Sequence, residues 1–184
     1  MHVLRLLRIF IPLLLLAAIV AGSVLVFSSR SDLERARKQV ETTWQPLHAA
    51  LNTRYALLSV ADAAVQSVPG PLHQVAAEVK TAYTDWHNLG EQNGSVTTEV
   101  SAANNLEALG RRLVLAARAA PRLVGNPALG PVNAFAALAQ PSSSAAFDAA
   151  VGRFERARNR PARRFAARVL GYDTIPAYDT SAAN

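Results

Sequence analysis

The sequence predicts an all-α protein in which an N-terminal transmembrane helix is continuous with an antiparallel four-helix bundle. Three observations carry this prediction. An uncharged apolar run covers Ile9–Phe27, alanine is abundant while strand-forming residues are few, and apolar residues recur at spacings of three and four in four later segments. Removing the N-terminal segment leaves roughly 150 residues, the usual size of one domain.

The apolar run Ile9–Phe27 follows a basic N-terminal tail, residues 1–8. Nineteen helical residues span roughly 28 Å, close to the ~30 Å of a bilayer's hydrocarbon core. Pro12 lies in the first turn, where a helix tolerates proline. The alternative is a cleavable signal peptide with its cleavage site at Val20–Gly22. We favour the anchor because the apolar run continues beyond that site to Phe27.

The flanking charges bear on orientation. Arg5 and Arg8 favour a cytoplasmic N-terminus and an extracytoplasmic domain, on a single-pass protein of the bacterial inner membrane. Basic residues within 30–38 leave the opposite orientation open. Small residues four apart could also pack two anchors into a homo-oligomer: Ala17 with Ala21, and Ala18 with Gly22.

The domain, residues 30–178, is expected to hold four long helices, and residues 179–184 a flexible tail. The first helix follows the anchor directly, and its apolar stripe keeps its phase across Pro46, so we expect a kink there and not a break. A further short helix is expected at Val132–Ala139. The four long helices are expected at residues 31–68, 72–89, 96–120 and 143–170.

The inward stripes of these helices consist of large apolar residues. Trp44 and Trp86 lie on them and are read as core residues. The stripe of the fourth helix is Phe147, Val151, Phe154, Phe165 and Val169, and the segment Tyr172–Tyr178 is expected to pack along the bundle.

Several of these residues together resemble the LemA family of bacterial membrane proteins. The resemblance implies a membrane-attached helical bundle without an established enzymatic activity, and it brings no catalytic residues. Where the family has an I-P-N-L-V run, this chain has Leu58–Asp62. The matching residues are Val40-Glu41, Trp44, Leu47, Leu51, Arg54-Tyr55, Leu57-Leu58, Asn105-Leu106, Leu109, Leu113, Pro121-x-Leu123, Phe154–Asn159 and Tyr172–Pro176.

No catalytic, cofactor or metal site is predicted. The chain has no cysteine, which excludes disulfides, thiolate nucleophiles, cysteine zinc sites and lipoprotein acylation. No two histidines have the spacing of a helical metal site. The serines Ser142–Ser144 are interpreted as a helix cap. The expected function is therefore that of a binding or scaffold protein with a protein or anionic-polymer partner.

The fourth helix carries the candidate binding surface. On a continuous helix, five arginines lie within about 100° of one another, opposite the apolar stripe. We call them the arginine ridge: Arg153, Arg156, Arg160, Arg163 and Arg164. All nineteen basic residues except Lys38 and Lys80 are arginine, and the net charge is +6. The ridge is thus either an anion-binding surface or a product of GC-rich genome composition.

Helix lengths disfavour lipid as the partner of this ridge, because the fourth helix would end roughly 15 Å short of the bilayer, beyond a Debye length of about 8 Å. Nucleic acid is also disfavoured, since no aromatic residues are interleaved with the arginines and the domain would have to be cytoplasmic.

Arg158 differs from the ridge because it falls on the apolar stripe, between Phe154 and Phe165. We expect it to be partly buried and paired, with Glu107 or Asp85 as the partner at a suitable height in the bundle.

Overall fold

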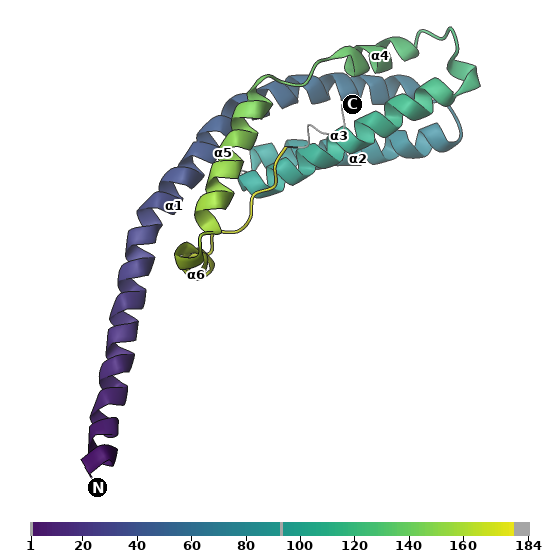
Figure 1. The fold of residues 1–184 in the computed structure, drawn as a ribbon. Helices are drawn as coiled ribbons and strands as arrows, with labels where there is room; N and C mark the ends of the chain where they lie inside the picture. Colours follow the sequence, from purple (N-terminus) through teal and green to yellow (C-terminus); the bar gives the residue numbers. More distant parts are fainter. Residues whose placement is uncertain (1, 93, 179–184) are drawn as a thin grey trace. The chain divides into compact units, whose positions relative to one another are not determined.

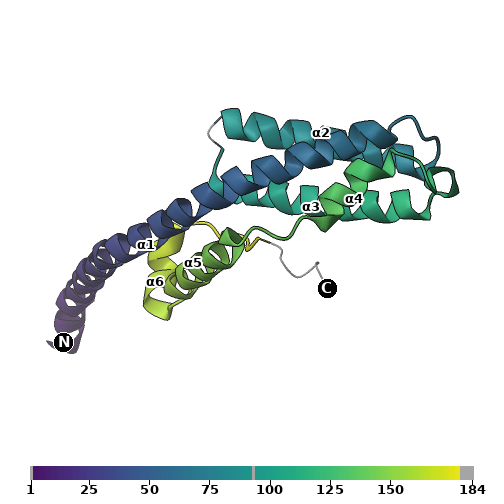
Figure 2. The same ribbon diagram turned by 90° about the horizontal axis from the view of Figure 1, so that it is seen from above.

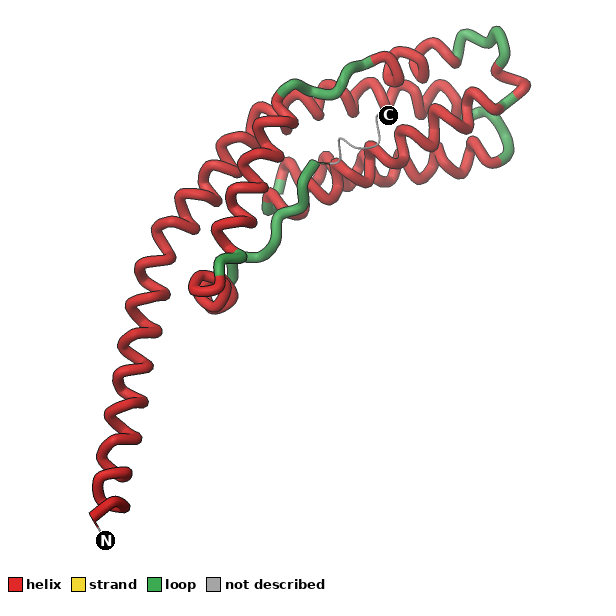
Figure 3. Tube along the Cα trace, in the orientation of Figure 1, coloured by secondary structure: helices red, strands yellow, loops and turns green. Residues whose placement is uncertain are grey.

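The computed structural model describes residues 2–92 and 94–178, and within this part of the chain all secondary structure is helical (Figure 3). The predicted all-α class is therefore correct. Side chains of residues 2–19, 21, 22, 24–28 and 162 are not described. Among the residues that are, no helix has both the length and the apolarity to cross a membrane. Apart from Val20 and Ser23, the side chains of the predicted anchor lie outside this set.

Helix α1 runs from His2 to Val65 without interruption (Figure 1). It passes through Pro46, as the unbroken apolar stripe predicts, and ends three residues before the expected position. Gly70 then adopts a φ of 107°, a conformation that side chains with a Cβ rarely take, and Pro71 starts the next helix.

Helices α2 (Pro71–Glu91) and α3 (Val96–Ala119) lie close to their expected bounds. Ser95 caps α3 by accepting a hydrogen bond from the Thr98 N–H at 3.2 Å. A 3₁₀ turn, η1 (Pro121–Leu123), leads to α4 (Leu129–Ala137), which begins three residues before the expected short helix.

The expected fourth helix is two helices, α5 (Ser143–Arg158) and α6 (Pro161–Val169). Proline disfavours helical geometry in the residue before it, and Arg160 is accordingly extended, with a ψ of 135°. The break resets the helical phase. Phe165 and Val169, expected to point inward, are 66% and 60% exposed, whereas Ala166 and Ala167 are buried.

The chain divides into two compact units. Unit 1 comprises Met1–Gln39 with Gly152–Thr174, and unit 2 comprises Val40–Val151 with Ile175–Asn184. The residues expected to form one bundle, 30–178, therefore belong to both units, and the boundaries lie inside α1, inside α5 and between Thr174 and Ile175.

The core of unit 2 lies between the second half of α1, α2 and α3, which run side by side in Figure 2. Trp44, Tyr55 and Trp86 form an aromatic cluster there: Trp44 and Trp86 are 6.3 Å apart between ring centroids, and Tyr55 meets Trp86 edge-on at 5.2 Å. Both tryptophans are buried, as predicted. Their indole N–H groups donate to Glu99 and Asn52, so the cluster leaves neither polar atom unsatisfied.

Candidate binding cleft

A buried polar network lies in unit 2 between α1, α3 and the C-terminal segment. The Arg54 guanidinium donates to Glu107 from Nε at 2.6 Å and from Nη2 at 3.2 Å. The Tyr178 hydroxyl donates to the same carboxylate at 2.9 Å. Glu107 is only 1% exposed. Burial acts to lower the pKa of Arg54, but the hydrogen bond and charge of Glu107 outweigh it and raise that pKa.

Beside this network a half-open cleft of about 620 Å³ lies between α3 and α4. One wall is a face of α3, where Val114 and Leu115 lie between Arg111 and Arg118. The other wall is the end of α4 and the extended segment that follows it, residues 136–140. The complete lining is Arg54, Glu107, Arg111, Val114, Leu115, Arg118, Phe135, Ala136, Ala137, Leu138, Ala139 and Gln140.

Gly110 makes this arrangement possible. A Cβ at position 110 would lie 2.7 Å from Cζ of Phe135, closer than real side chains approach. Without that Cβ, the Phe135 ring packs directly on α3 and stacks under Arg54, whose Cζ lies 4.5 Å from the ring centroid. The glycine thus fixes both α4 and the guanidinium at the floor of the cleft.

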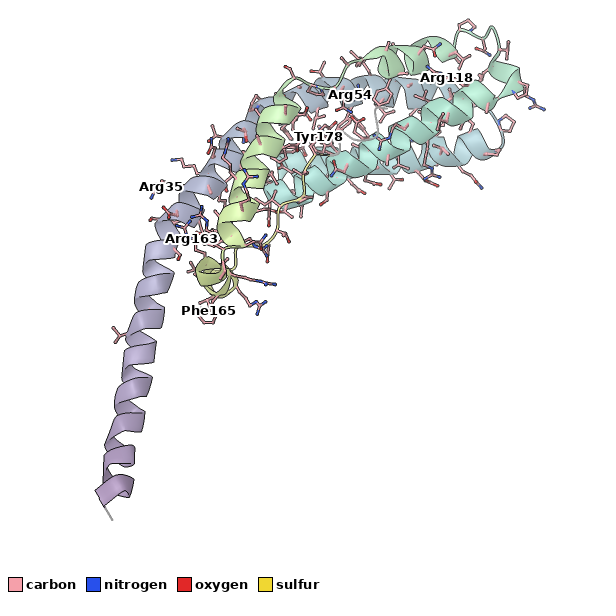
Figure 4. The ribbon with its side chains drawn as sticks, viewed as in Figure 1. Arg35, Arg54, Arg118, Arg163, Phe165 and Tyr178 are labelled. Carbon is pink, nitrogen blue, oxygen red and sulfur yellow. The ribbon has the colours of Figure 1, made fainter. Side chains whose placement is uncertain are left out.

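The cleft is cationic. Three arginines face one carboxylate, and Arg54 already neutralises Glu107. A guanidinium has five N–H donors. Within the described residues, Arg54 uses three of them, two on Glu107 and one on the Leu138 carbonyl at 2.9 Å. Figure 4 shows Arg54 close to Tyr178 and Arg118 farther along α3. An anionic group entering the cleft therefore meets the remaining Arg54 donors and the exposed guanidinium of Arg118.

Two buried polar atoms have no hydrogen-bond partner in the part of the chain that the structure describes, Oε1 of Gln140 and Oδ1 of Asp62. Gln140 lies in the cleft wall.

Because of the break at Pro161, the arginine ridge does not lie on one continuous helix. Arg153 and Arg156 lie on α5, Arg160 lies at the break, and Arg163 and Arg164 lie on α6. Arg163 is paired with Asp32 of α1 at 2.5 Å, and its side chain is 23% exposed. The five arginines do not share one helical face, because that prediction assumed one helix through residue 161. That they bind an anion stays a prediction.

Arg158 is partly buried and paired, as expected from its place on the apolar stripe. Its partners are not Glu107 or Asp85. Its Nε donates to the Tyr172 carbonyl at 2.9 Å, and its Nη1 lies 3.2 Å from Glu155. The turn after α6, where Gly171 has a φ of 70°, brings Tyr172 back to α5 and supplies the local partner.

The sequence contains a signal for the buried position of Arg54. Arg54 lies three residues after Leu51 and four before Leu58, so it occupies the inward face of α1. An arginine at such a position requires a buried acid. Nothing in the sequence indicated the cleft, because its walls come from α3 and from a segment after α4.

Over the described residues, no group of three or more histidine or acidic side chains is placed to hold a metal ion. Comparison with protein-family models, with curated proteins and with solved structures finds no match to this chain.

Proposed function

We propose that this chain is a membrane-anchored, non-catalytic binding protein of LemA type, whose cleft beside Arg54 holds an acidic, apolar segment of a partner protein. The anchor is Ile9–Phe27, in the bacterial inner membrane, with the N-terminus cytoplasmic. The uncharged run, the helical backbone through it and the quoted LemA-like residues support this assignment.

The observation that carries the binding function is the chemistry of the cleft. Its one carboxylate, Glu107, is held by Arg54 and Tyr178 and is not placed to act as an acid or base on a substrate. What the cleft offers is an apolar wall between arginines and unused guanidinium donors, which suits recognition of a carboxylate next to an apolar side chain.

Site-specific photocrosslinking in cells tests this function on the full chain. A photoreactive phenylalanine replaces Leu115, which is 67% exposed at the cleft, or Val124, which is 80% exposed outside it. We expect position 115, and not position 124, to yield one discrete crosslinked partner protein. The crosslinked peptide of that partner should contain Asp or Glu beside apolar residues. Arg118→Glu should abolish the crosslink, whereas the matched control Arg122→Glu should not. Equal crosslinking from both positions, or persistence with Arg118→Glu, would refute the cleft as the site.

The anchor is tested separately. Wild-type protein should remain in membranes after a carbonate wash, and Leu15→Arg combined with Ala18→Arg should release it, because charges at a bilayer centre cost roughly 2.5–3.5 kcal/mol each. Release of the wild type would refute the anchor. A reporter fused to the C-terminus then decides orientation. A cytoplasmic C-terminus would revive the nucleic-acid alternative, while an external one removes it.

A further inference from the structure

Helix α6 exposes an apolar pair that folding alone does not explain. Phe165 and Val169 lie four residues apart and are largely exposed, flanked by the exposed residues Arg164 and Arg168. The opposite face, Ala166 and Ala167, is buried and lets the helix pack closely. A short helix with basic and large apolar side chains together on its outer face is typical of helices that lie in a membrane interface.

The second observation is where unit 1 holds this helix. Arg163 of α6 pairs with Asp32 of α1 at 2.5 Å. Asp32 lies five residues after Phe27, the last residue of the apolar run, which corresponds to roughly 7.5 Å along a helix. The headgroup layer of a bilayer is about 5–8 Å thick on each side. An anchor ending at Phe27 therefore places α6 at the outer edge of the headgroups.

The turn after α6 also holds this helix beside α1. Tyr172 stacks with Arg37 of α1, whose Cζ lies 5.9 Å from the ring centroid, and its carbonyl accepts from Arg158 of α5. Figures 1 and 2 both show α6 beside α1. In Figure 4 the Phe165 side chain points away from α5, in the direction in which α1 runs toward its N-terminus.

We propose that α6 is an interfacial helix that lies on the bilayer beside the anchor. Phe165 and Val169 enter the boundary between headgroups and acyl chains, and Arg160, Arg164 and Arg168 bind anionic phospholipid headgroups. The inference rests on the proposed anchor. Continuity with that anchor and the positive charge select an anionic lipid surface as the occupant of this face.

This assignment replaces the expectation that the arginines end roughly 15 Å short of the membrane. That estimate assumed one straight fourth helix of about 28 residues. The break at Pro161 and the Arg163–Asp32 pair instead bring the last turns against α1 near its membrane end.

Depth-dependent quenching on the full-length protein tests the proposal. Because the chain has no native cysteine, Phe165→Cys gives a unique site for a nitrobenzoxadiazole fluorophore, and Val124→Cys in unit 2 gives the matched exposed control. Each protein is reconstituted into vesicles of phosphatidylcholine with phosphatidylglycerol, and vesicle flotation verifies insertion of the anchor. We expect nitroxide lipids labelled near the headgroup to quench position 165 at least about threefold more than position 124.

Charge reversal supplies the second measurement. Arg164→Glu with Arg168→Glu should reduce the quenching at 165 without changing flotation, since each arginine near an anionic surface changes association about fivefold. Arg118→Glu with Arg122→Glu alters the net charge equally and should leave the quenching unchanged. Flotation with equal quenching at 165 and 124 would overturn the interfacial helix and leave the anchor standing. Loss of flotation in the wild type would overturn both.

Discussion

Single buried side chains determine how unit 2 is held together. Arg54 and Glu107 are nearly excluded from solvent, and they form an ion pair in which the Tyr178 hydroxyl also donates to the carboxylate. Such a pair contributes little compared with an apolar pair of the same shape, but removal of one partner leaves an uncompensated buried charge. The network therefore fixes the register of α1 against α3 more than it adds stability.

Arg54→Met should lower the free energy of unfolding by about 3–5 kcal/mol, because Glu107 stays buried without its counter-charge. The matched control is Arg112→Met, which removes an exposed pair with Glu78 and should cost less than about 1 kcal/mol. Chemical denaturation followed by tryptophan fluorescence measures both. Equal losses in the two variants would contradict a buried ion pair.

Asp62 should make the stability of the fold depend on pH, and at neutral pH its buried carboxylate should destabilise the protein. Burial raises its pKa above the ordinary value of 3.8, with Lys80 opposing the rise. The folded protein then binds the proton more tightly than the unfolded chain, so this carboxyl costs stability above its folded pKa and none below its unfolded one.

Asp62→Asn should therefore raise unfolding stability by roughly 1 kcal/mol at neutral pH and by almost nothing near about pH 3. Melting curves across this range test it, with Asp85→Asn, at an exposed position, as the control. A gain that grows toward acid pH would reverse the assigned sign.

At the scale of the element, two prolines inside predicted helices behave differently. Pro46 leaves α1 intact, while Pro161 separates α5 from α6. Trp44 and Leu47 beside Pro46 are buried, so packing holds that helix on both sides. Asn159 and Arg160 beside Pro161 are exposed, and Arg160 takes the extended conformation that proline favours in the residue before it. The apolar stripe predicted the intact helix at Pro46. It did not predict the break at Pro161, because a stripe does not show how the residues around the proline are packed.

Gly110→Ala should destabilise the protein by about 1–3 kcal/mol, because the new methyl group overlaps Phe135 and displaces α4 from α3. Gly130→Ala, in α4 itself, meets nothing within 4 Å and should be neutral or slightly stabilising. Thermal unfolding compares the two. Photocrosslinking from position 115 should weaken in Gly110→Ala, since the cleft wall moves with α4.

At the scale of the molecule, the chain leaves unit 2 in α5, builds part of unit 1 with α6, and returns at Ile175. The return is fixed by Asp148, which accepts from the Tyr178 N–H at 2.8 Å, and by Asn104, which donates to the Ala177 carbonyl at 3.0 Å. Ile175 and Tyr178 are buried, so the C-terminal segment is part of the core of unit 2.

Both tryptophans lie in unit 2, so their fluorescence reports on that unit. Tyr178→Ala should lower its unfolding free energy by about 3 kcal/mol through lost burial and the lost bond to Glu107. Tyr172→Ala alters an aromatic residue of unit 1 and should leave the tryptophan-detected transition nearly in place. Equal shifts in both variants would show that the units unfold as one.

The sequence by itself determined the helical class, the uncharged run Ile9–Phe27, the helices near 72–89 and 96–120, and the inward tryptophans, since periodicity and local capping encode these features. Only the tertiary structure decided the partners of Arg54 and Arg158, the cleft, and the position of α6. The Arg54–Glu107, Tyr178–Glu107 and Arg163–Asp32 contacts join residues more than fifty positions apart, and such contacts leave no periodic trace in the sequence. The partners of Arg158 depend on the turn at Gly171, which brings Tyr172 back to α5.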